Sequence, residues 1–139
     1  MAAICTYWIS TTLLSLLYLS SAFLYVTKRD FVRQAQADLG YHAAHLVTFM
    51  IVIKILGPIA ILSRVSVPLS DLAYAGIFYH LLLSGMAHLG VRKPKGAIPA
   101  AIGLALLAAS FATQNAARDM PSPYAPAAAD HHLPLTTRN

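Results

Sequence analysis

Four blocks of apolar residues alternate with short polar segments over the first 114 residues of the chain. The blocks cover residues 8–26, 43–63, 72–90 and 97–114. Each contains about 18–21 residues, the length that an α-helix needs to cross about 30 Å of hydrocarbon. The pattern predicts an all-α membrane protein built as a bundle of four transmembrane helices.

The segment at residues 27–41, between the first two blocks, is too short and too polar to cross a membrane. Its apolar residues approximate one helical face and its polar residues the opposite face. The apolar set is Phe31, Val32, Ala35 and Leu39, and the polar set is Lys28, Arg29, Arg33 and Gln36. We predict a short interfacial helix that ends at Gly40, with a solvated loop as the alternative.

Two blocks contain internal features. Gly57 and Pro58 interrupt the second block and predict a break in its helix. In the fourth block alanine recurs at every fourth position, which predicts a ridge of small residues that lets helices approach closely. The ridge consists of Ala97, Ala101, Ala105 and Ala109.

The two ends of the chain carry different signals. Lys28 and Arg29 follow the first block and no basic residue precedes it, so we expect a retained span rather than a signal peptide. From residue 115 onward the chain holds four of its eight prolines without periodicity. We therefore divide the chain into a four-helix domain, residues 1–114, and a Pro/Ala-rich tail, residues 115–139. We expect the tail to be extended or disordered unless a partner holds it.

The composition excludes several classes of protein. Hydrophobic residues make up 58% of the chain and charged residues 11%, against about 45–50% and about 25% in soluble domains. An ordinary soluble enzyme is thereby excluded. The single cysteine, Cys5, excludes an intramolecular disulfide or a CxxC motif. The chain has no glutamate, and its aspartates lie outside the apolar blocks, so we predict no carboxylate-bridged metal site.

The net charge of +5 indicates membrane orientation rather than nucleic-acid binding, because the charges flank the blocks. The segments after the first and third blocks carry six basic residues, and the opposite side carries Arg64, Arg118 and Arg138. The six are Lys28, Arg29, Arg33, Arg92, Lys93 and Lys95. We expect a multi-pass protein with these basic segments in the cytoplasm and both termini outside.

Lys54 stands near the middle of the second block with apolar neighbours on both sides. A charged side chain at that depth costs about 2.5–3.5 kcal/mol on insertion scales, so it normally faces the bundle interior and has a partner. Snorkelling is the alternative, but either interface is about 15 Å away. We predict an interior lysine that is functional or paired.

His80 lies near the middle of the third block, which runs antiparallel to the second, so Lys54 and His80 could meet. Gly76, His80, Ser84 and His88 recur every four residues and predict a polar ridge opposite Lys54. Such a layer can bind an anionic or carbonyl oxygen, or supply a base. Lys54 and His80 are therefore the candidate catalytic residues, and Ser84 and His88 are candidate ligand-binding residues. A histidine bonded only to backbone carbonyls or to Ser84 is the alternative for His80.

Haem or metal binding is a weaker hypothesis. His42, His45 and His88 all lie toward the cytoplasmic end, as axial ligands on neighbouring helices would. Their spacings match no ligand motif, however, and interfacial histidines need no ligand.

Several aromatic residues lie deep in the blocks, where they can pack the core or line a pocket for a flat ring such as a quinone. They are Tyr18, Tyr25, Phe49, Phe78 and Tyr79. We favour core packing for the set, and add Tyr79 to the candidate ligand-binding residues.

Three segments resemble the DoxX-like family of small bacterial membrane proteins. They are SAFLYVTKRDFVRQAQADLGY from Ser21, IVIKILGPIAIL around Lys54 and AYAGIFYHLLLSGMAHL around His80. The resemblance covers about residues 8–114 and implies a four-helix bundle in a bacterial inner membrane. The family's name derives from a subunit of a quinone-linked thiosulfate-oxidising system, so the resemblance implies a quinone-associated role. Related bundles resemble assembly factors.

The chain departs from the family pattern at one position. That pattern has an aspartate at His80, where it would pair with the lysine corresponding to Lys54, whereas His88 matches. The resemblance therefore implies that Lys54 here finds a different partner, either backbone oxygens or a ligand anion.

Three functions remain open from the sequence. The first is an accessory subunit of a redox system that binds a quinone or similar isoprenoid and contacts another membrane protein or a second copy of itself. The second is a stand-alone membrane enzyme that performs acid–base chemistry, such as isomerisation or cyclisation, on a lipophilic substrate. For it His80 is the mid-span group with a suitable unperturbed pKa. The third is a scaffold or assembly factor without a ligand.

Overall fold

The structure is a computed structural model that describes residues 1–128 and consists of helices joined by short connections. The helices are α1 (Ala2–Thr27), α2 (Arg29–Asp38), α3 (Leu46–Ser63), α4 (Val67–Gly90) and α5 (Ile98–Thr113), with short 3-10 helices η1 (Pro94–Ala97) and η2 (Gln114–Ala117) before and after α5. Four helical stretches are long and apolar enough to cross a membrane: α1, α3, α4 and the stretch Pro94–Ala117. The prediction of an all-α protein with four spans and a short helix between the first two is confirmed.

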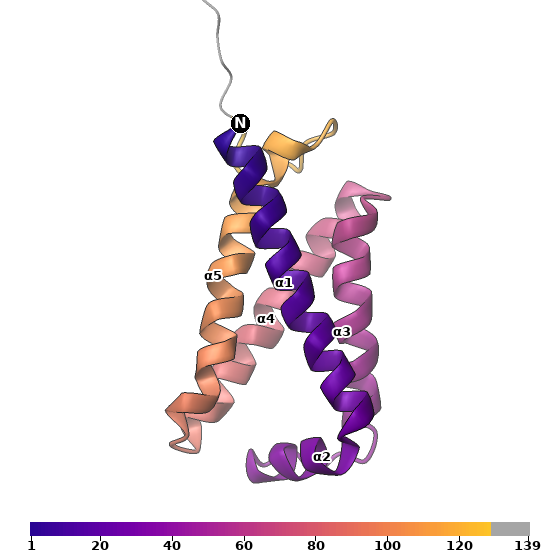
Figure 1. Ribbon diagram of the computed structural model, residues 1–139, viewed down its shortest axis with the longest axis vertical. Helices are drawn as coiled ribbons and strands as arrows, with labels where there is room; N and C mark the ends of the chain where they lie inside the picture. Colours follow the sequence, from indigo (N-terminus) through magenta and orange to yellow (C-terminus); the bar gives the residue numbers. More distant parts are fainter. Residues whose placement is uncertain (129–139) are drawn as a thin grey trace, which may run out of the picture.

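The four spans form a bundle in which α1 packs against α5 on one side and α3 on the other, while α4 packs against both α3 and α5 (Figure 1). The start of α1 and the end of α5 lie at the same end of the bundle, and α2 lies across the opposite end. Toward α2, the helices α3 and α4 diverge. This divergence positions the candidate site described below.

Local signals explain why two of the helices begin or end where they do. Ser66 caps α4, because its hydroxyl accepts a hydrogen bond of 3.2 Å from the backbone N–H of Leu69, and Pro68 stands in the first turn. Helix α2 ends as predicted at Gly40, whose φ of +91° suits glycine. There the N–H of Tyr41 bonds to the carbonyl of Gln36, and the N–H of Gly40 to that of Ala37, as in a Schellman motif.

The predicted break at Gly57 and Pro58 is wrong. Helix α3 continues through both residues, and Pro58 is buried inside it. A proline can remain within a helix at the cost of one hydrogen bond, here the bond to the carbonyl of Lys54, four residues earlier. Gly57 allows the close approach of α4, because a β-carbon there would lie 3.2 Å from Cδ1 of Ile77.

Helix α2 has a narrower apolar face than the sequence predicts. Val32 is buried against Val47 and Ile51 of α3, whereas Phe31 remains 65% exposed. The far end of α2 is tied to the α4–α5 connection by an ion pair of 3.6 Å between Asp38 and Lys93. The two basic segments therefore lie at the same end of the bundle.

The alanine ridge of α5 does not make the helix contacts predicted for it. Ala101 and Ala105 are exposed, while Ala97 and Ala109 are half-buried. The buried residues of α5 are instead Ala100, Gly103, Leu107 and Ser110. Their spacing alternates between three and four residues and so stays on one helical face, whereas a strict four-residue repeat drifts by about 40° per step.

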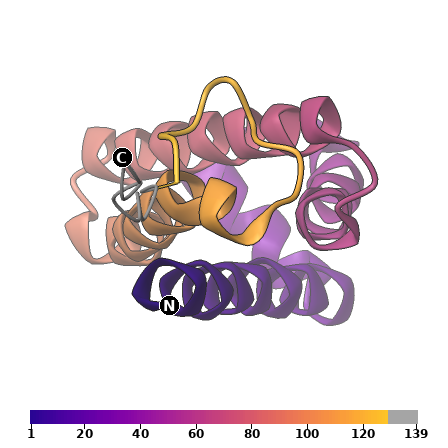
Figure 2. The same ribbon diagram turned by 90° about the horizontal axis from the view of Figure 1, so that it is seen from above.

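After η2, residues 118–128 form a hydrogen-bonded loop over the end of the bundle, so the described part of the tail is not an extended segment (Figure 2). Asn115 holds the loop: its Nδ2 donates to the carbonyls of Ser122 and Pro126, at 3.0 Å each, and its Oδ1 accepts from the N–H of Ser122 at 2.7 Å. The Ser122 hydroxyl in turn donates to Asp71 of α4 at 2.9 Å. The rest of the tail, residues 129–139, lies outside the described residues.

Candidate functional site

Three side chains from three helices converge in the middle of the bundle. The hydroxyl of Tyr18 on α1 lies 2.7 Å from Nδ1 of His80 on α4, within hydrogen-bonding distance. The ammonium of Lys54 on α3 lies over the ring of Tyr18, 5.2 Å from its centroid. Lys54 is 6% exposed, so the prediction that it faces the bundle interior is confirmed. Tyr18 thus bridges the two residues that the sequence expected to meet.

The depth of these residues follows from their positions along the helices. Each residue lies a similar number of residues from the end of its helix that faces α2. The separation is nine residues from Tyr18 to Thr27, eight from Lys54 to Leu46 and ten from His80 to Gly90. At about 1.5 Å per residue, each stands about 12–15 Å from that end. These three polar groups therefore form one layer at mid-depth in the bundle.

The environment of Lys54 contains aromatic faces rather than an acid. A second ring, that of Tyr25, lies 4.9 Å from the ammonium. Among residues 1–128 the recorded ion pair is that of Asp38 and Lys93, so no described carboxylate neutralises Lys54. Cation–π contacts contribute about 0.5–2 kcal/mol each, which offsets part of the cost of placing a cation at mid-depth.

His80 can present either a donor or an acceptor to a ligand. The Tyr18 hydroxyl also lies 3.5 Å from the carbonyl of Ile77, so it can donate to that oxygen or to Nδ1 of His80. When it donates to Nδ1 of a neutral imidazole, the proton of the ring is on Nε2, which is then a donor. When Tyr18 donates to Ile77, Nδ1 carries the proton and Nε2 is an acceptor.

A cavity of about 200 Å³ adjoins this layer on the side of α2, where α3 and α4 diverge. Its lining combines the polar groups of His80, Ser84 and Gln36 with aromatic and aliphatic side chains. The aromatic and aliphatic residues are Tyr25, Leu39, Tyr41, Leu46, Met50, Leu83 and Ala87. Pockets that enclose a drug-sized ligand measure about 300–1,000 Å³, so this cavity fits a ring-sized head group and not a long chain.

The remaining candidate residues lie in three different places. Ser84 borders the cavity together with His80. His88 instead packs against Gly96 of the α4–α5 connection, and a β-carbon at Gly96 would overlap its ring. Gly76 faces open space, since a β-carbon added there would have no neighbouring atom within 4 Å. The predicted ridge from Gly76 to His88 therefore does not form one polar face, because a four-residue repeat drifts by about 40° per step.

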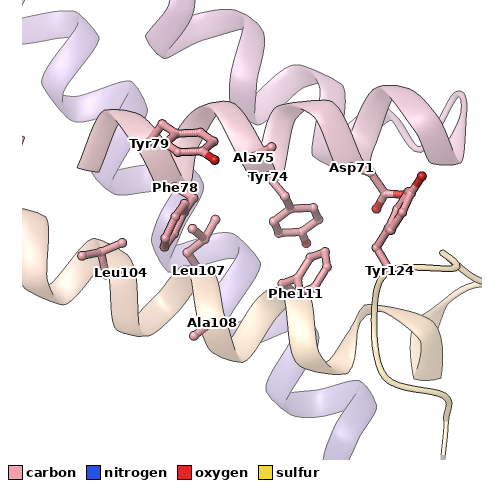
Figure 3. A pocket seen from close by; sticks show the side chains of 10 residues that line it. All are labelled: Asp71, Tyr74, Ala75, Phe78, Tyr79, Leu104, Leu107, Ala108, Phe111 and Tyr124. Atoms are coloured by element: carbon pink, nitrogen blue, oxygen red, sulfur yellow. The ribbon is translucent and has the colours of Figure 1, made fainter. Parts of the chain in front are cut away.

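Tyr79 lines a separate groove between α4 and α5, shown in Figure 3. The groove has a volume of about 640 Å³ and is almost entirely apolar apart from Asp71 and three tyrosine hydroxyls. Its other lining residues are Tyr74, Ala75, Phe78, Leu104, Leu107, Ala108, Phe111 and Tyr124. The structure does not bring Tyr79 together with Lys54 and His80.

The histidines considered for haem or metal binding do not converge. His42 and His45 are exposed in the connection between α2 and α3, and His88 lies against the other basic connection. Within residues 1–128 no three His, Cys, Asp or Glu side chains lie close enough to hold a metal ion.

The sequence did not single out Tyr18, Tyr25 or Gln36 as site residues. Tyr18 and Tyr25 belonged to the deep aromatic set, but nothing in the sequence fixes which way α1 is rotated. The usable signal was the phenol hydroxyl, because a buried tyrosine usually finds a hydrogen-bond partner. Gln36 was assigned to the polar face of α2, and the structure places it half-buried at the cavity.

The fold and this layer define a small four-span membrane protein with a polar site inside the bundle. Residues 9–110 match the DoxX-like family, and the chain belongs to that family. No curated protein and no solved structure matched the chain in the two further comparisons.

Proposed function

We propose that the protein is an accessory membrane subunit that binds the head group of a quinone or similar isoprenoid in the cavity beside Lys54, Tyr18 and His80. The observation that carries the proposal is the 2.7 Å contact of Tyr18 with His80, under a buried ammonium and next to a cavity. A quinone carbonyl is an acceptor, and Nε2 of His80, a residue that lines the cavity, can donate to it. The Lys54 ammonium lies next to the lining, 4.9 Å from the ring centroid of Tyr25. The aromatic and aliphatic lining suits the ring.

The accessory role rests on the outward face of α5. Ala101 and Ala105 are exposed there, with Ala97 and Ala109 beside them, and small residues let a neighbouring helix approach closely in a membrane. The partner in this proposal is a helix of another membrane protein or of a second copy. The name of the family, which derives from a quinone-linked system, is consistent with this role.

The proposal predicts that the Lys54→Met variant loses the ligand. Protein extracted mildly from native membranes should contain a quinone or isoprenoid, and Lys54→Met should retain about tenfold less, because a charged hydrogen bond contributes about 1.5–3 kcal/mol. Methionine has a similar length and removes a buried charge, so no loss of folding is expected. The measurement is mass spectrometry of solvent extracts at equal protein, together with quinone-linked electron transfer in the membranes.

Lys28→Met is the matched control, since Lys28 is exposed between α1 and α2. It should retain the ligand. A wild-type protein without any co-extracted isoprenoid, or a Lys54→Met variant that keeps the wild-type amount, would contradict quinone binding.

A second candidate, acid–base catalysis on a lipophilic substrate, is favoured by the same Tyr18–His80 contact. A phenol hydrogen-bonded to an imidazole is a pair that can donate and accept a proton at one place. Catalysis would change the mass or chromatographic retention of a lipid incubated with the pure protein, and Tyr18→Phe would abolish that change. In the binding case the lipid is recovered unchanged.

We also propose that the end of the bundle carrying α2 faces the cytoplasm, with both chain ends outside, because six basic residues lie at the α2 end. In a Cys5→Ser background, Lys95→Cys should react with a membrane-impermeant maleimide only after the cells are permeabilised. The native Cys5, which is exposed near the start of α1, should react in intact cells. Strong labelling of the Lys95→Cys variant in intact cells would reverse the orientation.

A further inference from the structure

Four polar atoms are buried at the end of the bundle opposite α2 and have no hydrogen-bond partner among residues 1–128. They are Oη of Tyr7, Oε1 of Gln114, and Nε and Nη2 of Arg118. Tyr7 and Gln114 are both 0% exposed. Buried polar groups in folded proteins are nearly always paired, so a cluster of unpaired ones points to a missing partner.

The helix contacts place Tyr7 and Gln114 in the same layer. The hydroxyls of Thr11 on α1 and Ser110 on α5 lie 2.7 Å apart, and the Tyr74 hydroxyl lies 2.6 Å from that of Ser110. Tyr7 is one turn before Thr11, and Gln114 is one turn after Ser110, so both extend this contact outward by one turn. Helices α1 and η2 are in contact there.

Two arginines lie at this layer. Arg118 follows η2 directly, and Arg64 reaches it from the α3–α4 connection, where it donates to the carbonyl of Ala117 and lies 5.8 Å from the ring centroid of Trp8. The guanidinium edge of Arg118 remains without a described partner.

The neighbouring acids do not neutralise that edge. Asp71 accepts from the Ser122 hydroxyl at 2.9 Å through one oxygen and from Nε2 of Gln114 at 3.5 Å through the other. Asp119 is exposed and forms no ion pair within residues 1–128. Both acids thus leave the Arg118 edge unmatched.

The unpaired atoms match the chemistry of a phosphate group. Nε–H and Nη2–H lie on one edge of a guanidinium and together bind two oxygens of one oxyanion. The Tyr7 hydroxyl adds a donor, and Oε1 of Gln114 accepts from a hydroxyl on the phosphate or on its glycerol.

The place also suits a lipid head group. Arg118 follows immediately after the last apolar stretch, Pro94–Ala117, so it lies at the depth of the membrane surface. The loop of residues 118–128 passes above this end of the bundle (Figure 2).

We propose that Tyr7, Gln114 and Arg118 form an oxyanion site that binds a phosphate group, carried by an anionic lipid or free in solution. The site is at the end of the bundle opposite α2, away from the mid-depth layer of Lys54 and His80, and uses neither residue. The test of this site is therefore independent of the test of quinone binding.

The experiment measures thermal unfolding of the full-length protein in neutral detergent with three additions: phosphatidylglycerol, phosphatidylcholine, or inorganic phosphate. Phosphatidylglycerol should raise Tm and phosphatidylcholine should not. The Arg118→Gln variant should need about tenfold or more phosphatidylglycerol for the same rise in Tm, since the substitution removes a charged pair of hydrogen bonds. Arg118→Lys keeps the charge but loses the paired edge, so it should recover only part of the affinity.

Lys95→Gln is the control, because Lys95 is exposed at the α2 end. It should behave as wild type. A Tm rise with inorganic phosphate equal to that with phosphatidylglycerol, lost in Arg118→Gln, supports the site and assigns it to free phosphate. The proposal is overturned if neither addition raises the Tm of the wild type, or if Arg118→Gln responds as the wild type does.

Discussion

Replacing His80 with alanine is expected to lower the amount of bound isoprenoid by up to about tenfold, whereas His42→Ala and His45→Ala leave it unchanged. The reason is that His80 lies at mid-depth in the bundle and is paired with Tyr18. His80→Ala removes a donor beside the cavity and leaves the Tyr18 hydroxyl with the carbonyl of Ile77 at 3.5 Å in place of its 2.7 Å partner. A lost hydrogen bond to a ligand costs about 0.5–1.5 kcal/mol, up to about tenfold in affinity. His42 and His45 are exposed to water and lose nothing comparable. The measurement is ligand content by mass spectrometry at matched membrane abundance.

The comparison of histidines also locates the site. If His80→Ala kept its ligand while His45→Ala lost it, the functional site would be at the connection between α2 and α3 and not in the middle of the bundle. His80→Gln provides a further check, since a glutamine can still bond to the Tyr18 hydroxyl and should retain more ligand than alanine.

Replacing Gly103 with alanine is expected to destabilise the bundle by up to about 2 kcal/mol, because overpacking the contact between three helices costs about 1–3 kcal/mol and the helix preference of alanine offsets about 1 kcal/mol of it. A β-carbon at Gly103 would lie 2.9 and 3.0 Å from the two methyl carbons of Leu81 on α4, and 3.2 Å from Cδ2 of Leu17 on α1. The free energy of unfolding, measured in mixed micelles of dodecyl sulfate and neutral detergent, should fall.

Gly76→Ala is the matched control on α4. No atom lies within 4 Å of a β-carbon at Gly76, and alanine favours a helix over glycine by about 1 kcal/mol. This variant should therefore be as stable as the wild type or more stable. Equal destabilisation of both variants would show that the loss of a glycine, and not the close approach at Gly103, causes the effect.

The hydrophobic pattern was sufficient to predict the spans and the interior position of Lys54. Span lengths follow from membrane thickness, and a charge at mid-depth can be satisfied only inside the bundle. The short helix before Gly40 was also predictable, because its termination depends on local backbone chemistry.

The partners of Lys54 and His80 were not predictable from the pattern. Helix α1 carries Ser and Thr on several sides, so the sequence does not show that the side with Ser10, Thr11 and Tyr18 faces the interior. The sequence likewise does not show which side of α5 faces the bundle. Its regularly spaced alanines are not the buried residues, whereas Gly103 and Ser110 are buried against the neighbouring helices. The correct contact pattern depends on how the helices cross, which only tertiary packing decides.

The pairing of Asp38 with Lys93 bears on how the cavity is closed during synthesis. A hydrogen bond from Gln34 and the nearby Lys93 ammonium lower the pKa of Asp38, so its carboxylate is ionised at neutral pH. The contribution of this ion pair to stability is therefore fully present above the ordinary pKa of an aspartate, and it is lost as the pH falls through the lowered pKa. Asp38 emerges from the ribosome two spans before Lys93. Helix α2 can therefore form this ion pair only after α4 has been made, and the cavity, which His80, Leu83 and Ser84 of α4 line, is completed no earlier.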